Sequence, residues 1–130
     1  ADAVVIAADT IVIAGGRFLG KPRHAADARE MLSALSGRWH HVVTGVAVVH
    51  ARENLSLADS AVTAVLFREL GEDEIERYVE TREPLDKAGA YGIQGKAALF
   101  VERLEGDYFN VVGLPLVKLA GLLERAGVRI

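Results

Sequence analysis

The segment Asp-Ala-Val-Val-Ile-Ala-Ala-Asp at residues 2–9 decides the fold class. It is short, largely apolar and rich in β-branched residues, which is typical of a strand covered on both faces within an α/β sheet. Asp9 is then expected at the carboxyl end of this strand. The chain continues as extended structure, turns at Gly15-Gly16 and returns as a short strand. The sequence therefore predicts a hairpin that leads to Gly20-Lys21-Pro22.

Further helices and strands are predicted from the spacing of apolar residues and from glycine and proline stop signals. The predicted helices are 23–35, 72–80 and 114–126, and the predicted strands are 39–50, 57–67, 97–104 and 108–112. The strands 39–50 and 57–67 are expected to form a long antiparallel pair. Between the second helix and the third pair of strands, residues 82–95 combine three glycines with polar side chains, which is typical of a loop that carries a functional site.

Composition limits the classes of protein to which the chain can belong. At 130 residues it fits one compact domain, and the net charge of -3 supplies no basic field for long nucleic acid. No apolar run reaches membrane-spanning length, so a membrane partner is not expected. The absence of cysteine excludes disulfides and suits a reducing compartment, and we predict a cytoplasmic protein. The chain begins at Ala1 without methionine, close to a predicted buried strand, which suggests that an N-terminal segment is missing.

Two charged residues flank the predicted hairpin. Asp9 is followed by Thr10, and Lys21 lies beyond the second strand, so the hairpin can bring both charges to one end of the sheet. A carboxylate beside a triphosphate can hold a divalent cation or accept a proton from water, and a lysine can offset phosphate charge. From the spacing alone, a surface ion pair is the favoured interpretation of Asp9 and Lys21 over a catalytic site, because such pairs are common.

A second cluster of polar residues lies in the glycine-rich loop at 83–95. Its glycines allow the backbone to approach a ligand closely, and Gln94 has an amide with one donor and one acceptor group. Such an amide complements the N3 proton and the O4 carbonyl of uracil or thymine, whereas cytosine presents the opposite pattern. A tight loop whose polar groups bond to one another explains the same residues equally well.

Five segments in order along the chain narrow these alternatives. They are Ala-Asp-Thr at 8–10, Gly-Lys-Pro at 20–22, Met-Leu-Ser-Ala-Leu-Ser-Gly at 31–37, Asp-Lys-Ala-Gly-Ala-Tyr-Gly-Ile-Gln-Gly at 86–95 and Val-Val-Gly-Leu-Pro-Leu at 111–116. Together they resemble the Maf family of nucleoside triphosphate pyrophosphatases, also described as septum formation inhibitor-like proteins. Several long matches in order are specific, and they favour the functional reading of both clusters.

The resemblance implies an α/β fold with a bent mixed β-sheet flanked by helices, similar to that of inosine triphosphate pyrophosphatases, and a homodimer. It implies hydrolysis of dTTP or UTP, with modified pyrimidine triphosphates as further substrates, to the monophosphate and pyrophosphate. A divalent cation, Mg²⁺ or Mn²⁺, is implied as cofactor. The loop at 86–95 is more similar to the subgroup that acts on dTTP and UTP than to the one that acts on 7-methyl-GTP.

The family's site residues map onto matching positions of this chain. Asp9 matches the proposed proton acceptor and is a candidate metal ligand, and Lys21 matches a residue that contacts the triphosphate. Thr10 and Gln94 match positions associated with substrate selection. The remaining candidates are Asp86 and Lys87, which are expected to line the site.

The chain departs from the family pattern at its beginning. Family members start with a strand and a Ser-x-Ser-Pro-Arg-Arg loop that contacts phosphate, and neither is present. We therefore expect residues 1–130 to form a single Maf-like domain without that strand and loop. The alternatives are a nucleotide-binding or cell-division regulatory module without turnover, and an inactive fragment. A role in septation would follow from the family name alone.

Overall fold

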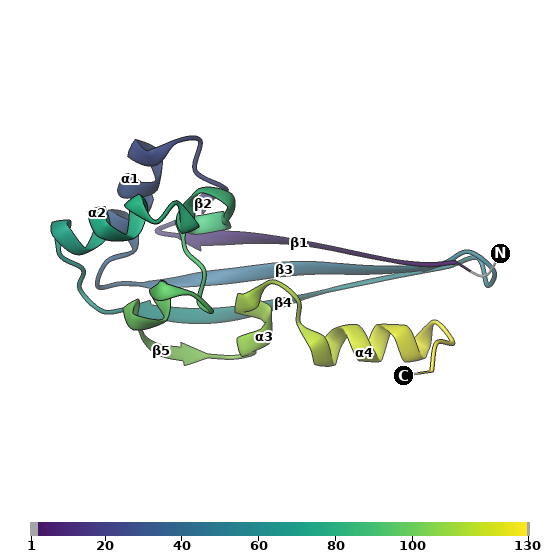
Figure 1. Cartoon of the computed structure of the whole chain (residues 1–130). Helices are drawn as coiled ribbons and strands as arrows, with labels where there is room; N and C mark the ends of the chain where they lie inside the picture. The colour runs from purple at the N-terminus through teal and green to yellow at the C-terminus, as the bar shows by residue number, and fades with distance from the viewer. Residues whose placement is uncertain (1–2, 130) are drawn as a thin grey trace.

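A five-stranded antiparallel sheet forms the frame of residues 3–129, which the computed structural model describes (Figure 1). Its strands lie in the order β2-β1-β3-β4-β5. They span Val4–Ala14 (β1), Arg17–Leu19 (β2), Trp39–His50 (β3), Leu55–Phe67 (β4) and Val101–Glu105 (β5). The predicted α/β class is confirmed, and the predicted hairpin and long antiparallel pair are both present.

Helices lie at both ends of this sheet. They span Ala25–Leu35 (α1), Glu72–Glu80 (α2), Tyr108–Val112 (α3) and Leu116–Arg125 (α4), and short 3-10 helices span Glu83–Asp86 (η1), Ala88–Ala90 (η2) and Lys96–Phe100 (η3). In Figure 1, α1 and α2 lie together at one end, while α4 runs beside β3 and β4 toward the other. No helix within residues 3–129 is long and apolar enough to cross a membrane.

Two apolar clusters hold these elements together. The larger joins α1, α2 and the loop after α2 to the sheet, with Leu32, Phe67 and Tyr78 among its buried side chains. The smaller places Leu119 and Leu122 of α4 against the valines of β3, including Val48. Burial of each large apolar side chain stabilises such a cluster by about 1.5 to 3 kcal/mol.

The first strand is longer and less covered than the sequence predicts. Its pairing with β3 runs from Val4 to Ile13, so Asp9 lies in the middle of β1 and not at its carboxyl end. Val5 and Ile6, which point to opposite faces, are 57% and 47% exposed. The apolar composition predicts a strand correctly, but it does not determine what covers that strand. The prediction of a strand buried on both faces is wrong for the described residues.

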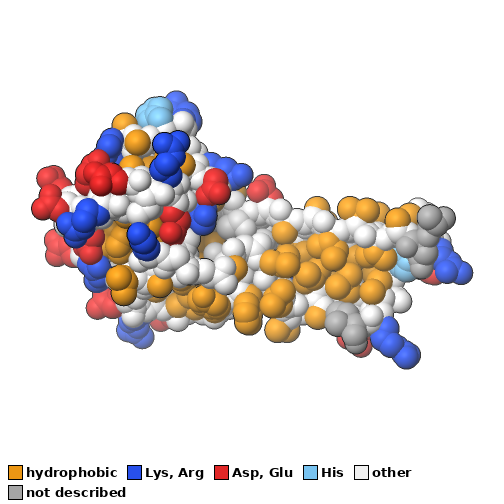
Figure 2. Space-filling model, viewed as in Figure 1, with side chains coloured by type: hydrophobic (Ala, Val, Ile, Leu, Met, Phe, Trp, Pro, Cys, Tyr) orange, Lys and Arg blue, Asp and Glu red, His pale blue; other side chains and the backbone are white. Residues whose placement is uncertain are grey.

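A broad apolar surface lies over the half of the molecule that contains α4 (Figure 2). Exposed apolar side chains on the elements of this half include Val5, Ile6, Val49 and Val117. Charged side chains gather instead at the end that contains α1 and α2 (Figure 2).

Two local predictions near the end of the chain are also wrong. Residues 108–112 form α3 and not a strand, because Asp107 accepts a hydrogen bond from the backbone of Phe109 at 2.8 Å and caps the helix. Residues 96–100 form η3 before β5 begins. A turn starts there because the carbonyl of Gly95 accepts the backbone N–H of Ala98 at 3.1 Å.

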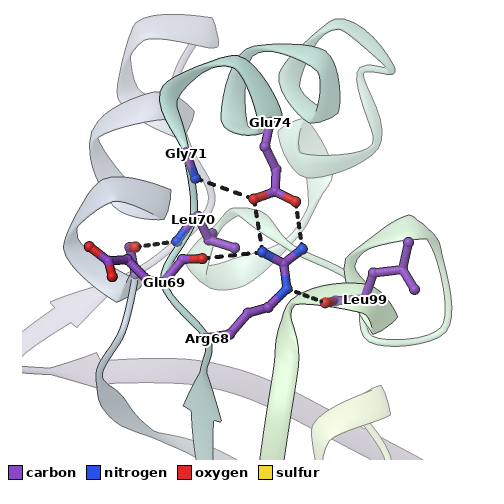
Figure 3. Close-up of polar contacts among 7 residues, drawn as sticks. Arg68, Glu69, Leu70, Gly71, Glu74 and Leu99 are labelled. Carbon is purple, nitrogen blue, oxygen red and sulfur yellow. Dashed lines mark hydrogen bonds and ion pairs between the residues drawn. The ribbon is translucent and has the colours of Figure 1, made fainter.

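Arg68 connects the end of β4 to the elements that follow it (Figure 3). Its guanidinium donates to both carboxylate oxygens of Glu74 at 2.9 and 2.5 Å and to the carbonyl of Leu99 at 2.8 Å. Such a paired arrangement is the strongest geometry for an arginine and a carboxylate. It fixes the start of α2 relative to η3.

Candidate active site

A cavity of about 570 Å³ lies between β1, the loop after α2 and the end of α3. This volume lies in the range of small-molecule sites in proteins, which is roughly 300 to 1,000 Å³. All six residues that the sequence predicts for the site line it: Asp9, Thr10, Lys21, Asp86, Lys87 and Gln94. The fold thus brings together positions that are spread over most of the sequence. Their chemical roles remain predictions.

The β1 wall presents Asp9 and Thr10. Asp9 is exposed, and its cross-strand neighbour is Gly45, where an added Cβ would meet nothing within 4 Å. The carboxylate therefore has open space beside it. The hydroxyl of Thr10 lies 2.9 Å from that of Thr44, which in turn donates to the carbonyl of Asn110. These hydrogen bonds restrict the position of the Thr10 side chain in the cavity wall.

Lys21 reaches the cavity from the segment that follows β2. This segment is tied to the loop after α2, because the backbone N–H of Gly89 donates to the carbonyl of Gly20 at 3.1 Å. Gly89 has a φ of 73°, and a Cβ there would lie 2.8 Å from a methyl group of Val12. Both the conformation and the lack of space require glycine at this position. The close approach brings Lys21 and the loop to the same cavity.

The loop contributes a pair of charges to the cavity wall. Lys87 donates to a carboxylate oxygen of Asp86 at 2.9 Å, and the Asp86 carboxyl group is largely exposed. This hydrogen bond, with the positive charge of Lys87, lowers the pKa of Asp86. A pair this exposed contributes little to stability. Lys87 lines the cavity, so this pair places a positively charged side chain in the cavity wall.

Glu83 and the residues Val111 to Gly113 also line the cavity, although they are not among the six residues that the sequence predicts for the site. Glu83 begins the glycine-rich loop and is part of the same polar cluster, so composition offered a weak signal for it. Val111 to Gly113 lie at the end of α3, and they belong to the segment Val-Val-Gly-Leu-Pro-Leu at 111–116, which was a signal for them. Asp107 as a helix cap was the signal that this segment is helical.

The carboxylates of the cavity do not form a complete metal centre. Within residues 3–129, no three His, Cys, Asp or Glu side chains are grouped closely enough to hold a metal ion by themselves. Mg²⁺ is commonly held by one or two carboxylates together with substrate phosphates and water. The open space beside Asp9 fits that mode of binding, in which the ligand supplies the remaining oxygens.

Comparison with known proteins gives consistent matches. A family model described as Maf-like protein matches residues 1–126. A dTTP/UTP pyrophosphatase of Moorella thermoacetica is 60% identical over 127 residues, which cover 98% of this chain and 66% of the relative. Proteins of the same name from Alkaliphilus oremlandii and Dictyoglomus thermophilum are 57% and 53% identical over 95% and 97% of this chain. The chain spans 64% and 65% of the length of these two relatives.

Proposed function

Because this chain belongs to the family of Maf-like proteins, we propose that it is a nucleoside triphosphate pyrophosphatase that hydrolyses dTTP and UTP to the monophosphate and pyrophosphate. The observation that carries the proposal is the meeting of six dispersed candidate residues at one cavity. The names of relatives that are 53% to 60% identical support the choice of substrate. Modified pyrimidine triphosphates that keep the same base edge are further candidates.

The proposed reaction is attack of water on the α-phosphoryl group. The new bond joins the water oxygen to the α-phosphorus, and the bond from that phosphorus to the bridging oxygen breaks, so that pyrophosphate leaves. Asp9 accepts the proton of the attacking water. Lys21 lies near the negative charge that develops on the phosphates, which lowers the barrier.

Base selection is assigned to Gln94 and Thr10. The carbonyl oxygen of the Gln94 amide accepts the N3 proton of uracil or thymine, and its N–H group donates to O4. Lys87 and Asp86 line the same cavity, where the Lys87 ammonium group can contact a phosphate oxygen.

A divalent cation, Mg²⁺ or Mn²⁺, completes the proposed site. In the alternative role of Asp9, its carboxylate would hold this cation together with oxygens of the triphosphate. When bound, such a cation neutralises phosphate charge and orients the leaving group. We also propose a cytoplasmic homodimer. The exposed apolar side chains of Val5 and Val49, which are cross-strand partners on β1 and β3, support association.

The test is release of pyrophosphate from UTP, dTTP, CTP and GTP with Mg²⁺ or Mn²⁺. We expect release from UTP and dTTP that Asp9→Asn abolishes. The matched control is Asp59→Asn, which alters an exposed aspartate on β4 that is paired with Lys118. Binding of UTP without release would favour the nucleotide-binding module. Neither binding nor release would identify an inactive fragment.

A further inference from the structure

The turn at Gly92–Gly95 determines where Gln94 lies. The backbone N–H of Gly95 donates to the carbonyl of Gly92 at 3.1 Å, so Gln94 is the third residue of a four-residue turn. Its side chain is exposed and lines the cavity. A displacement of this turn would move the amide with it.

Tyr78 holds the first residue of the turn. Its hydroxyl oxygen accepts the backbone N–H of Gly92 at 3.1 Å, and its own proton is donated to a carboxylate oxygen of Glu83 at 2.9 Å. The ring is buried and packs edge-on against Phe100, with the ring centres 5.1 Å apart. Burial raises the pKa of Tyr78, which keeps the hydroxyl protonated as this donation requires.

Glu83 and Lys87 occupy the space that side chains at the two glycines would fill. A Cβ at Gly95 would lie 2.0 Å from a carboxylate oxygen of Glu83, and a Cβ at Gly92 would lie 2.5 Å from a methylene carbon of Lys87. Both glycines therefore allow these side chains to pack directly against the backbone of the turn. Contacts at each end restrict the turn.

We propose that Tyr78 and Glu83 are positioning residues for base selection. They hold the Gly92–Gly95 turn so that the amide of Gln94 meets the N3–H and O4 edge of a uracil or thymine base. This inference rests on the proposed function, and it adds two residues that act on the base through the turn. Loss of the Tyr78 hydroxyl should therefore weaken the preference for UTP over CTP.

The test compares Tyr78→Phe with the matched control Tyr108→Phe, which removes the same atom from an exposed tyrosine outside the cavity lining. The kcat/KM ratio of UTP to CTP is measured for both. Tyr78→Phe removes both hydrogen bonds of the hydroxyl, to Gly92 and to Glu83. We expect the loosened turn to lower this ratio about threefold to tenfold, mostly through the KM for UTP. Tyr108→Phe should leave the ratio within about twofold of the original protein.

Glu83 gives a second, independent comparison. Glu83→Gln keeps an oxygen that accepts the Tyr78 proton, whereas Glu83→Ala removes it. We expect Glu83→Gln to retain most of the discrimination that Glu83→Ala loses. An equal loss in both variants would overturn the role of this hydrogen bond.

Failure of this inference is distinguishable from failure of the proposed function. If no triphosphate is hydrolysed, titration calorimetry with UTP and CTP makes the same comparison of variants without turnover. If Gln94→Ala removes the preference for UTP and Tyr78→Phe does not, the positioning role is overturned. A uniform loss with both nucleotides in Tyr78→Phe would also overturn it, because a merely structural role predicts that result.

Discussion

The Nε2 atom of His40 lies 2.7 Å from the hydroxyl oxygen of Tyr91, across 51 residues of sequence. Both rings are buried, and each packs edge-on against Phe67, with ring centres 5.0 and 4.7 Å apart. Tyr91 also lines the cavity. The pair therefore connects β3 in the core directly to the wall of the candidate active site.

This pair predicts a dependence of stability on pH. Burial lowers the pKa of His40 from 6.5 to about 4, because the charged imidazolium is disfavoured there. Between these two values the unfolded chain binds a proton that the folded chain does not. The free energy of unfolding should therefore fall as pH falls, by about 2 kcal/mol between pH values of about 7.5 and 5.

Urea unfolding at both pH values measures this effect. Glutamine does not titrate, so His40→Gln should lose most of this pH dependence. Its free energy of unfolding should fall much less between the two pH values. An identical decrease in the two proteins would show that His40 is not its source.

The Arg68–Glu74 ion pair predicts a second dependence of stability on pH, in a lower range of pH. The hydrogen bonds from Arg68 are the main cause that lowers the pKa of Glu74 from 4.5 to about 2. This depressed pKa means that the stabilisation is fully present above the unfolded value and is lost as pH falls toward the folded value. Because both side chains are partly exposed, we expect Glu74→Gln to cost about 1 kcal/mol at neutral pH.

Thermal unfolding at about pH 7 and pH 3 measures this cost. The matched control is Glu69→Gln, an exposed glutamate beside the same arginine. The cost of Glu74→Gln should shrink at the lower pH, while the control stays near zero. A cost that did not change with pH would contradict the assignment.

Asn110 predicts a large loss of stability on substitution. It is fully buried, and its amide nitrogen donates to the carbonyl of Val42 and the hydroxyl of Thr63, each at 3.0 Å. Asn110→Asp replaces this donor with an acceptor that faces the Val42 carbonyl. We expect a cost of about 3 kcal/mol or more in urea unfolding, because a buried charge without a partner is expensive.

Tyr108→Phe, a near-isosteric change of an exposed residue on the same helix, is the control. It should lower the free energy of unfolding by less than about 0.5 kcal/mol. Equal stability of Asn110→Asp and the original protein would show that this amide does not fasten α3 to the sheet.

For substitution of Lys21 we predict a loss of activity that does not depend on the base of the nucleotide. Lys21→Met should lower kcat/KM about 100-fold or more, and by the same factor for UTP and CTP, because the triphosphate is common to both. Lys118→Met serves as the control, since this lysine lies on α4 and is paired with Asp59. Pyrophosphate release measures both variants. A loss confined to UTP would assign Lys21 to the base instead of the phosphates.

Local patterns predicted much of the secondary structure correctly. The turn at Gly15-Gly16 was predictable because adjacent glycines tolerate positive φ, and both adopt it, at 55° and 77°. The end of α1 was predictable in the same way from Gly37, which has a φ of 66°. The helix at residues 108–112 was not predictable from local patterns, since their aromatic and β-branched composition favours a strand. The Asp107 cap and the buried hydrogen bonds of Asn110 favour a helix instead.

By itself, the sequence determined the α/β class, the hairpin and most of the helices and strands, and it predicted six candidate site residues, because spacing and ordered motifs are local properties of the chain. Tertiary structure alone decided that Asp9 lies mid-strand beside open space, that His40 meets Tyr91, and that Tyr78 and Glu83 support the turn around Gln94. These relationships depend on packing between segments that are distant in sequence or on the folding of a glycine-rich loop. No periodicity in the sequence encodes such distances.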